Sequence, residues 1–330
     1  MTYHKNARHR LCKLCSVLAV TALGFITHGN ATAADTFPAK TVTLVVPTPA
    51  AGPLDFFARN LSPLLSTHWG QPVVVENKPG AGTALGTQAV ARSRPDGHTL
   101  LMANIAISAH GALSKAPLFD VERDLAPVAM VASTPYFLIA PEKAPSTLKD
   151  MVSYGKANPD KLNVAIIPNS QQHLDTARML SVLGIKATLV PYSGTSPITR
   201  ALVAGEIDLF LGTLAGMQPF FENGRLRPLG VTSEKPWPTL PDTPTLQSQG
   251  YDLVLDPWYA IFAPSSTPAD VLGKLREDIR KALQAPEFHK KVVDGGYVPR
   301  ITKHETLGRM VSENLKQSRE LVRVYNIQPE

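Results

Sequence analysis

Short runs of β-branched residues alternate with longer amphipathic runs along this chain, and this alternation limits its fold more than any other feature. From residue 40 to 104 it predicts strands and helices in turn, at Val42–Val46, Leu54–His68, Val73–Val75, Thr83–Ser93 and Leu100–Ala103. Consecutive strands separated by helices form a parallel sheet with right-handed crossovers. We therefore predict an α/β fold whose ligand site lies at the carboxyl ends of strands.

A second unit of the same kind follows the first. Its predicted strands and helices are Tyr136–Ala140, Thr147–Ala157, Leu162–Ile167, Leu174–Leu183, Thr188–Pro191, Pro197–Ala204, Ile207–Leu211 and Leu229–Thr232. The predicted helices Pro268–Leu283 and Lys303–Val324 have no sheet of their own, so we expect the chain to return and complete the first unit. The prediction is two α/β lobes, residues 35–134 plus 257–330 and residues 135–256, joined by a double-crossing hinge. A ligand cleft then lies between the lobes.

The first 34 residues have the pattern of a secretory signal peptide. Basic residues precede the apolar run Leu14–Ile26, and Ala31–Ala34 offers small side chains for cleavage, although the exact cleavage site stays open. The run is too short to span a bilayer, which disfavours a retained membrane anchor. We therefore expect an extracytoplasmic protein. Because Cys12 and Cys15 both precede residue 35, the mature chain should contain no disulfide.

The charge balance also changes when this segment is removed. Four of the 33 basic residues lie in it, Lys5, Arg8, Arg10 and Lys13, which leaves 29 basic residues against 27 acidic ones. A nearly neutral chain lacks the electrostatic character of a nucleic-acid-binding protein. We expect a monomer whose ligand is a small molecule and which binds no nucleic acid.

The stretch Val42–Asp55 (VTLVVPTPAAGPLD) predicts an anion site. Its strand ends in a turn of small residues, and Pro53 suits the first position of the helix that follows. Such a turn leaves backbone amides free at a helix start, where they stabilise negative charge. Asp55 has an alternative role, because a carboxylate in the first helical turn offsets the helix dipole. We expect the loop Asn104–His110 to face this turn across the same sheet edge.

Two further loops carry small polar residues before predicted helices. They are Asn169–His173 and Tyr192–Pro197, and each offers hydroxyl groups and amides at a helix start. Ordinary helix capping is the alternative for each loop. Because both loops follow strands of the second unit, they are predicted to face the cleft.

Sequence patterns of enzymes and cofactor sites are absent. The run Gly80–Gly86 has the spacing G-x-G-x-x-x-G and follows the second strand, so we interpret it as a tight turn with close helix packing rather than a dinucleotide site. Ser170, His173 and Asp175 fall within one and a half helical turns and cannot converge as a catalytic triad. We predict no catalytic residue, no metal site and no cofactor.

Several ordered segments together resemble one family along essentially the whole mature chain. They are Phe37–Lys40, Pro47–Asp55, Val74–Gly82, Pro95–Leu101, Val190–Thr195, Gly205–Asp208 and Pro238–Leu246. In these segments the chain is similar to the periplasmic solute receptors of tripartite tricarboxylate transporters, often called the Bug family. The resemblance implies a type II periplasmic binding protein that closes around a small organic carboxylate and delivers it to a two-component membrane permease.

The resemblance also implies which residues hold the ligand. Main-chain groups of two loops typically bind one carboxylate, which implies Thr48, Ala50, Ala51, Gly52 and Asp55 in the first lobe, and Ser193, Gly194, Thr195 and Asp208 in the second. Asn104, Asn169, Ser170 and Tyr192 are further candidates.

The chain departs from the family pattern at two places. Ala51 stands where the family usually has glycine, and Ile167–His173 lacks the two glycines usual in that loop. The ligand's identity therefore stays open, and so does contact by the second loop. Two alternatives also remain open from the sequence: delivery of the ligand to a sensor kinase, and a hydrolase that uses the same cleft.

Overall fold

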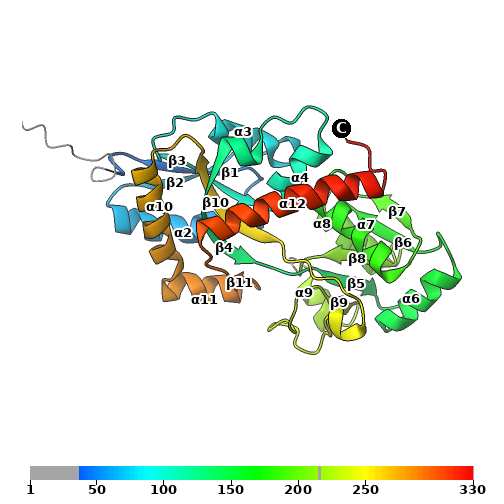
Figure 1. Cartoon of the computed structure of the whole chain (residues 1–330). Coiled ribbons are helices and arrows are strands. Elements are labelled where there is room, and N and C mark those ends of the chain that lie inside the picture. Colours follow the sequence, from blue (N-terminus) through cyan, green and yellow to red (C-terminus); the bar gives the residue numbers. More distant parts are fainter. Residues whose placement is uncertain (1–36, 215–216, 330) are drawn as a thin grey trace, which may run out of the picture.

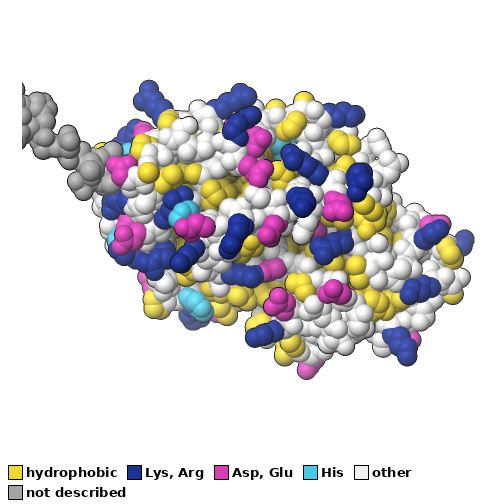
Figure 2. Space-filling view, viewed as in Figure 1, with side chains coloured by type: hydrophobic (Ala, Val, Ile, Leu, Met, Phe, Trp, Pro, Cys, Tyr) yellow, Lys and Arg dark blue, Asp and Glu magenta, His cyan; other side chains and the backbone are white. Residues whose placement is uncertain are grey.

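The computed structural model describes residues 37–214 and 217–329, which form two α/β lobes side by side (Figure 1). We call residues 37–134 and 257–329 lobe 1, and residues 135–256 lobe 2. The predicted signal peptide lies outside the described residues. Within them, no helix combines the length and apolarity that a membrane crossing requires. On the face shown in Figure 2, basic and acidic side chains are interspersed.

Lobe 1 is built on a six-stranded sheet with the order β11-β4-β10-β3-β1-β2. Its strands are β1 (Val42–Val46), β2 (Val73–Asn77), β3 (Thr99–Asn104), β4 (Leu125–Ser133), β10 (Trp258–Pro264) and β11 (Val298–Pro299). Side chains alternate between the two faces: Leu44 and Leu100 join one core, while Val45 and Leu101 join the other.

Helices cover both faces of this sheet. The helices α2 (Pro53–Trp69), α10 (Ala269–Leu283) and α11 (Pro286–Asp294) bury residues in the first core. The other core takes side chains from α3 (Ala84–Ala91), α4 (Ala106–Leu113), α5 (Val121–Asp124) and α12 (His304–Val324). A short 3₁₀ turn, Ala81–Thr83, leads into α3.

Lobe 2 is built on a five-stranded sheet with the order β7-β6-β8-β5-β9. Its strands are β5 (Phe137–Pro141), β6 (Asn163–Ile166), β7 (Thr188–Pro191), β8 (Leu209–Gly212) and β9 (Leu226–Val231). The helices α6 (Leu148–Ala157) and α7 (Gln171–Leu183) cover one face, and α8 (Thr195–Ala204) covers the other with residues near α9 (Gln218–Glu222). The predicted α/β fold with two lobes is confirmed.

Two differences from the prediction lie at the sheet edge of lobe 1. The prediction of a loop at Asn104–His110 is wrong, because Asn104 ends β3 and α4 begins at Ala106. The Asn104 Oδ1 atom accepts a hydrogen bond from the Ala106 amide at 3.2 Å at the start of this helix. Strand β4, which the sequence reading missed, is the partner that allows β10 to join the sheet of lobe 1.

The lobes meet at two chain crossings and at one helix. The crossings lie together, since the Thr134 amide donates to the Pro257 carbonyl at 3.0 Å. Helix α12 belongs to lobe 1 but runs across the junction and packs on α7 of lobe 2 (Figure 1). The lobes therefore share a packed interface in addition to the hinge.

Candidate functional site

The carboxyl ends of the parallel strands in both lobes lie at the junction between them. In lobe 1, β10 starts at this edge, since Trp258 pairs with Ser133 at the end of β4. In lobe 2, β5 starts at the matching edge, since Phe137 pairs with Gly212 at the end of β8. Loops that follow these strands therefore border the space between the lobes, where ligands of α/β sheets bind.

Asp55 folds the loop that follows β1. Its carboxylate is buried and accepts hydrogen bonds from the Ala51 amide at 2.9 Å, from Arg59 Nε at 2.8 Å and from Asn77 Nδ2 at 3.0 Å. Asn77 Nδ2 also donates to the Thr48 carbonyl at 3.1 Å. The bond from Arg59 is the largest influence on the Asp55 pKa, which is lowered. The Asp55 carboxylate therefore bonds groups of this loop and its neighbours, and the Ala51 amide is already used in one of these bonds.

The rest of this loop leaves a hydroxyl group without a partner. Thr48 Oγ1 is buried and has no hydrogen-bond partner among the described residues. Gly52 is extended, with φ −88°, and a Cβ atom built there would lie 3.9 Å from that hydroxyl. Ala51 has φ +66°, a left-handed conformation that glycine adopts more easily. A Cβ atom on Gly52 would thus be in van der Waals contact with the buried Thr48 hydroxyl.

The turn before α3 lies against this loop. Ala81, Gly82 and Thr83 all have positive φ, at 46°, 60° and 89°. A Cβ atom on Gly86 would lie 2.6 Å from the Lys78 carbonyl oxygen and 2.8 Å from Pro47 Cα. The geometry agrees with the interpretation of these glycines as a tight turn with close helix packing.

A cavity of about 470 Å³ lies between the lobes and takes its walls from both. Lobe 1 contributes the turn before α3 and helix α4, and lobe 2 contributes the loop between β6 and α7. The lining residues are Ala81, Gly82, Ala106, Ala109, His110, Leu113, Ser114, Ile167, Pro168, Asn169, Ser170 and Gln171. None of these residues is Lys, Arg, Asp or Glu.

Two helices begin at this cavity, α4 at Ala106 and α7 at Gln171. Helix amino ends carry partial positive charge and amide donors, which stabilise an anion without a cationic side chain. Burial lowers the pKa of His110, and its Nε2 atom accepts from the Leu118 amide at 3.2 Å. His110 is therefore neutral near pH 7.

Of the predicted residues in lobe 2, Asn169 and Ser170 line the cavity. Ser170 also caps α7: its Oγ atom donates to the Ile167 carbonyl at 2.6 Å and accepts from the His173 amide at 3.3 Å. Asn169 has φ +51°, which asparagine tolerates better than most residues. This loop thus caps α7 and also borders the space between the lobes.

Tyr192, Ser193, Gly194 and Thr195 follow β7 at the same edge. The Tyr192 amide donates to the Ile166 carbonyl at 2.9 Å, and Thr195 is the first residue of α8. Gly194 precedes the helix and provides no side-chain cap. These residues, and residues 48–52, do not line the 470 Å³ cavity.

A smaller interlobe cavity of about 150 Å³ lies near the hinge. Its walls include Thr134 and Tyr297 from lobe 1 and Thr213 and Gln218 from lobe 2. Tyr297 stacks on Phe56, with ring centroids 5.8 Å apart. The first turn of α2 is therefore close to this second space.

The prediction of ligand contact by Asp208 is wrong. Asp208 precedes β8, and its Oδ2 atom accepts from the Asn163 amide at 2.8 Å at the start of β6. The Asp208 amide donates in return to the Asn163 carbonyl at 2.9 Å. This pair joins the amino ends of two parallel strands, so Asp208 lies at the edge opposite the cleft.

The sequence reading placed residues 104–110 at this edge, but it missed that they form helix α4 and that Leu113 and Ser114 also line the cavity. The residues from Ile105 to Leu113 are mostly small and apolar, so they carry little of the helical period that could have revealed α4. Among the residues that the structure describes, no group of three or more His, Cys, Asp or Glu side chains is placed to hold a metal ion.

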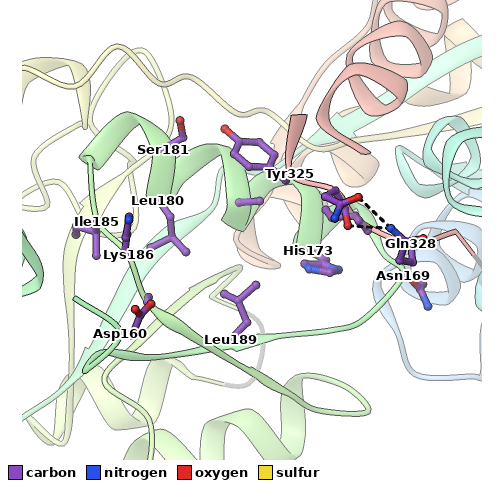
Figure 3. Close-up of a pocket in the computed structure, with 14 residues that line it drawn as sticks. Asp160, Asn169, His173, Leu180, Ser181, Ile185, Lys186, Leu189, Tyr325 and Gln328 are labelled. Atoms are coloured by element: carbon purple, nitrogen blue, oxygen red, sulfur yellow. Dashed lines mark hydrogen bonds between the residues drawn. The ribbon is translucent and has the colours of Figure 1, made fainter. Parts of the chain in front are cut away.

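A larger cavity of about 680 Å³ lies on the outer side of α7 (Figure 3). Its walls come from α7, from the turn before β7 and from the C-terminal segment Tyr325–Gln328. Asp160 and Lys186 at its rim precede β6 and β7. The cavity therefore takes most of its walls from lobe 2, and it shares Asn169 with the 470 Å³ cavity.

Comparisons with known proteins agree with this geometry. The family described as "Tripartite tricarboxylate transporter family receptor" matches residues 57–327. The protein BugT of Bordetella pertussis is 32% identical over 305 residues, which cover 90% of this chain and 94% of BugT.

Two solved structures from Rhodopseudomonas palustris are also similar. MatC with bound malate has a TM-score of 0.74 and 30% identity, over 87% of this chain and 100% of MatC. The protein Rpa4515 with adipate has a TM-score of 0.78 and 28% identity, over 89% of this chain and 100% of that one.

Proposed function

Because the chain belongs to the tripartite tricarboxylate transporter receptor family, we propose that it binds one small organic carboxylate between its lobes and delivers it to a two-component membrane permease. The ligand is held by lobe closure and is released unchanged. The segment 1–34 acts as the signal peptide that brings the receptor to the periplasm, where it works as a monomer.

One observation carries this proposal: the 470 Å³ cavity has walls from both lobes and adjoins the amino ends of α4 and α7. A carboxylate there gains amide hydrogen bonds and favourable helix dipoles. Neutral His110 adds no competing charge. Malate and adipate in two similar proteins are carboxylates of the size that such a cavity accommodates.

The loop Thr48–Gly52 supplies the second half of the proposed site. Although residues 48–52 do not line the 470 Å³ cavity, the Thr48 hydroxyl has no partner among the described residues and could bond a ligand oxygen when the lobes move. Asp55 contributes indirectly, because its bonds to Ala51, Arg59 and Asn77 hold the loop in shape. Loop Tyr192–Thr195 provides amides at the start of α8 from the other lobe.

The test is a thermal-shift and calorimetry screen with malate, adipate, other di- and tricarboxylates, aromatic acids and acidic amino acids. A ligand at one hundred times its Kd stabilises the native state by about 2.7 kcal/mol, which gives a clear rise in Tm. A chain that responds to none of these acids contradicts the proposal. Mass spectrometry of the chain purified without denaturant then identifies a ligand carried from the cell.

The role of the first loop is tested by Gly52→Val. The extended backbone accepts valine, and its Cβ would meet only Pro49 and Thr48 atoms at 3.7 Å or more, so we expect the fold to persist. The branched side chain fills the space beside Thr48 Oγ1, and binding should weaken at least about tenfold, or 1.4 kcal/mol. Gly52→Ala should have a smaller effect, and unchanged affinity in Gly52→Val removes this loop from the site.

A further inference from the structure

A buried polar network connects the two lobes behind the cleft. Asp175 of α7 is 4% exposed, and its Oδ1 atom accepts from Gln171 Nε2 at 2.9 Å. Gln171 in turn accepts at Oε1 from the Ser318 hydroxyl at 3.3 Å, and Ser318 belongs to α12 of lobe 1. The other partner of Asp175 is the hydroxyl of Tyr136, just past the first hinge crossing. The network therefore joins the hinge, lobe 2 and α12.

The surroundings of Asp175 stabilise its ionised form only weakly. Its hydrogen-bond partners, Gln171 and Tyr136, are neutral, and among the described residues the cation that lowers its pKa is Arg178 on the same helix. Burial raises the pKa of Asp175 to about 7, and this is the largest influence on it. A buried carboxyl without a contacting cation is favoured in its neutral form.

Among the described residues, the elements around Asp175 carry no other charge that acts on it. Strands β6 (NVAI) and β8 (LFLG), which pack on α7, carry no titratable residue. Around Ser318 on α12, Lys316 and Arg319 are exposed. Tyr259 of β10 lies near Tyr136, and burial raises the pKa of both hydroxyls, so both are neutral. His173 is the remaining titratable group on this part of α7, and burial lowers its pKa.

The interface that covers this network is made by elements of both lobes. An apolar cluster joins Ala109 and Leu113 of α4, Leu174 of α7, Leu321 and Val322 of α12, and Ile327 just beyond α12. Figure 3 shows Tyr325 and Gln328 of the C-terminal segment beside α7. If α12 and α7 separate, water reaches Gln171 and then Asp175.

We propose that Asp175 makes the relative position of the lobes sensitive to pH, by favouring the packed α12–α7 interface when its carboxyl group is protonated and the separated one when it is ionised. In the separated form water solvates the carboxylate, so its pKa falls toward the ordinary value of about 3.9. The packed form therefore binds more protons, and raising the pH favours separation.

The direction of the effect follows from these two protonation states. The packed form is fully favoured below the pKa of the separated form, and this advantage is lost as the pH rises to about 7, the value of the packed form. Each pKa unit between the two forms changes the ratio of packed to separated molecules tenfold. Only one consequence of this inference rests on the proposed function: a ligand that contacts both walls of the cavity should bind more weakly at higher pH.

The experiment measures the distance between the lobes without ligand, so it is independent of whether the proposed carboxylate binds. Spin labels are attached at Lys115→Cys of lobe 1 and Lys149→Cys of lobe 2, both exposed positions, with Cys12 and Cys15 replaced by serine. Distance distributions by pulsed electron paramagnetic resonance are recorded from pH 5 to pH 8.5. In the otherwise unchanged chain we expect the ratio of packed to separated molecules to fall about tenfold or more over this range.

Asp175→Asn is the decisive variant. The amide keeps the shape of the neutral acid and its bonds to Gln171 and Tyr136, so we expect a packed distribution at every pH. His173→Gln is the matched control on the same helix and should retain the pH response. Ser318→Ala, which breaks the contact to α12 without changing a titratable group, should raise the separated fraction at low pH. A flat profile in the unchanged chain, or an unaltered profile in Asp175→Asn, overturns the proposal.

Discussion

At the scale of single residues, the loop after β1 shows how one buried carboxylate fixes the shape of a turn. Asp55 uses its oxygens on Ala51, Arg59 and Asn77. The lowered pKa of Asp55 means that its ionised form is stabilised in the folded chain, chiefly by the hydrogen bond from Arg59. The residue thus links the shape of the loop to the charge of one buried group.

Replacement of Asp55 by Asn should therefore destabilise the chain at pH 7, by about 1–3 kcal/mol for a buried charged hydrogen-bond partner. The pKa of Asp55 is lower in the folded chain than in the unfolded chain, where it is about 3.9. The ionised carboxylate therefore stabilises the fold above pH 3.9, and this stability is lost as the pH falls through the pKa of the folded chain. The difference between the two chains in urea unfolding should shrink below pH 4. Asp252→Asn, at an exposed position, is the control, and an equal difference at pH 7 and pH 3 contradicts this account.

Ala51 gives a second prediction at this scale. Its φ of +66° costs a residue with a Cβ atom about 1–2 kcal/mol, whereas glycine adds about 0.5–1 kcal/mol of chain entropy on folding. Ala51→Gly should thus be neutral or stabilising by up to about 1 kcal/mol in denaturant unfolding. Ala50→Gly next to it, which relieves no positive φ, should destabilise. If both variants lose equal stability, the conformation of Ala51 carries no strain.

At the scale of elements, the position of α3 against the first loop depends on Gly86. A Cβ atom there would lie within 3 Å of main-chain atoms of Lys78 and Pro47, which belong to the turns after β2 and β1. Gly86→Ala should destabilise by about 1–3 kcal/mol through overpacking and should also weaken ligand binding, because the loop must shift. Gly273→Ala in α10 meets no atom within 4 Å and should gain up to about 1 kcal/mol. Equal responses of the two variants in thermal unfolding would show that α3 adapts freely.

The same scale shows what the sequence could predict. Strands such as Val42–Val46 and Thr188–Pro191 are bounded by prolines and other breakers, and their predicted ends match the structure. Helix α4 was missed because its residues are small and apolar, without a polar face that reveals the helical period. Asp208 was placed at the site by the family resemblance alone, whereas it precedes β8 and so lies at the opposite sheet edge from the loops that follow the strands. Local periodicity thus identifies elements, while the side of the sheet depends on strand direction.

At the scale of the whole molecule, the two lobes are more strongly connected than two chain crossings require. No local pattern in the sequence indicates that Leu174 of lobe 2 will pack on Ala109 and Leu113 of lobe 1, since the residues are more than 60 positions apart. Residues at the end of α12, Leu321 and Val322, pack against the same cluster. It borders the 470 Å³ cavity, which α4 also lines.

Leu174→Ala should therefore weaken the attachment of the lobes as well as the fold. Leu174 is fully buried, and so is Leu183 on the same helix, which packs only in the core of lobe 2. Each alanine variant should lose about 2–5 kcal/mol of stability, as buried leucines generally do. Only Leu174→Ala should also raise the separated fraction in the interlobe distance measurement and weaken ligand binding, because only this side chain contacts both lobes. If Leu183→Ala opens the lobes to the same extent, the separation follows from general loss of stability, and the contact of Leu174 with α4 has no specific part in closure.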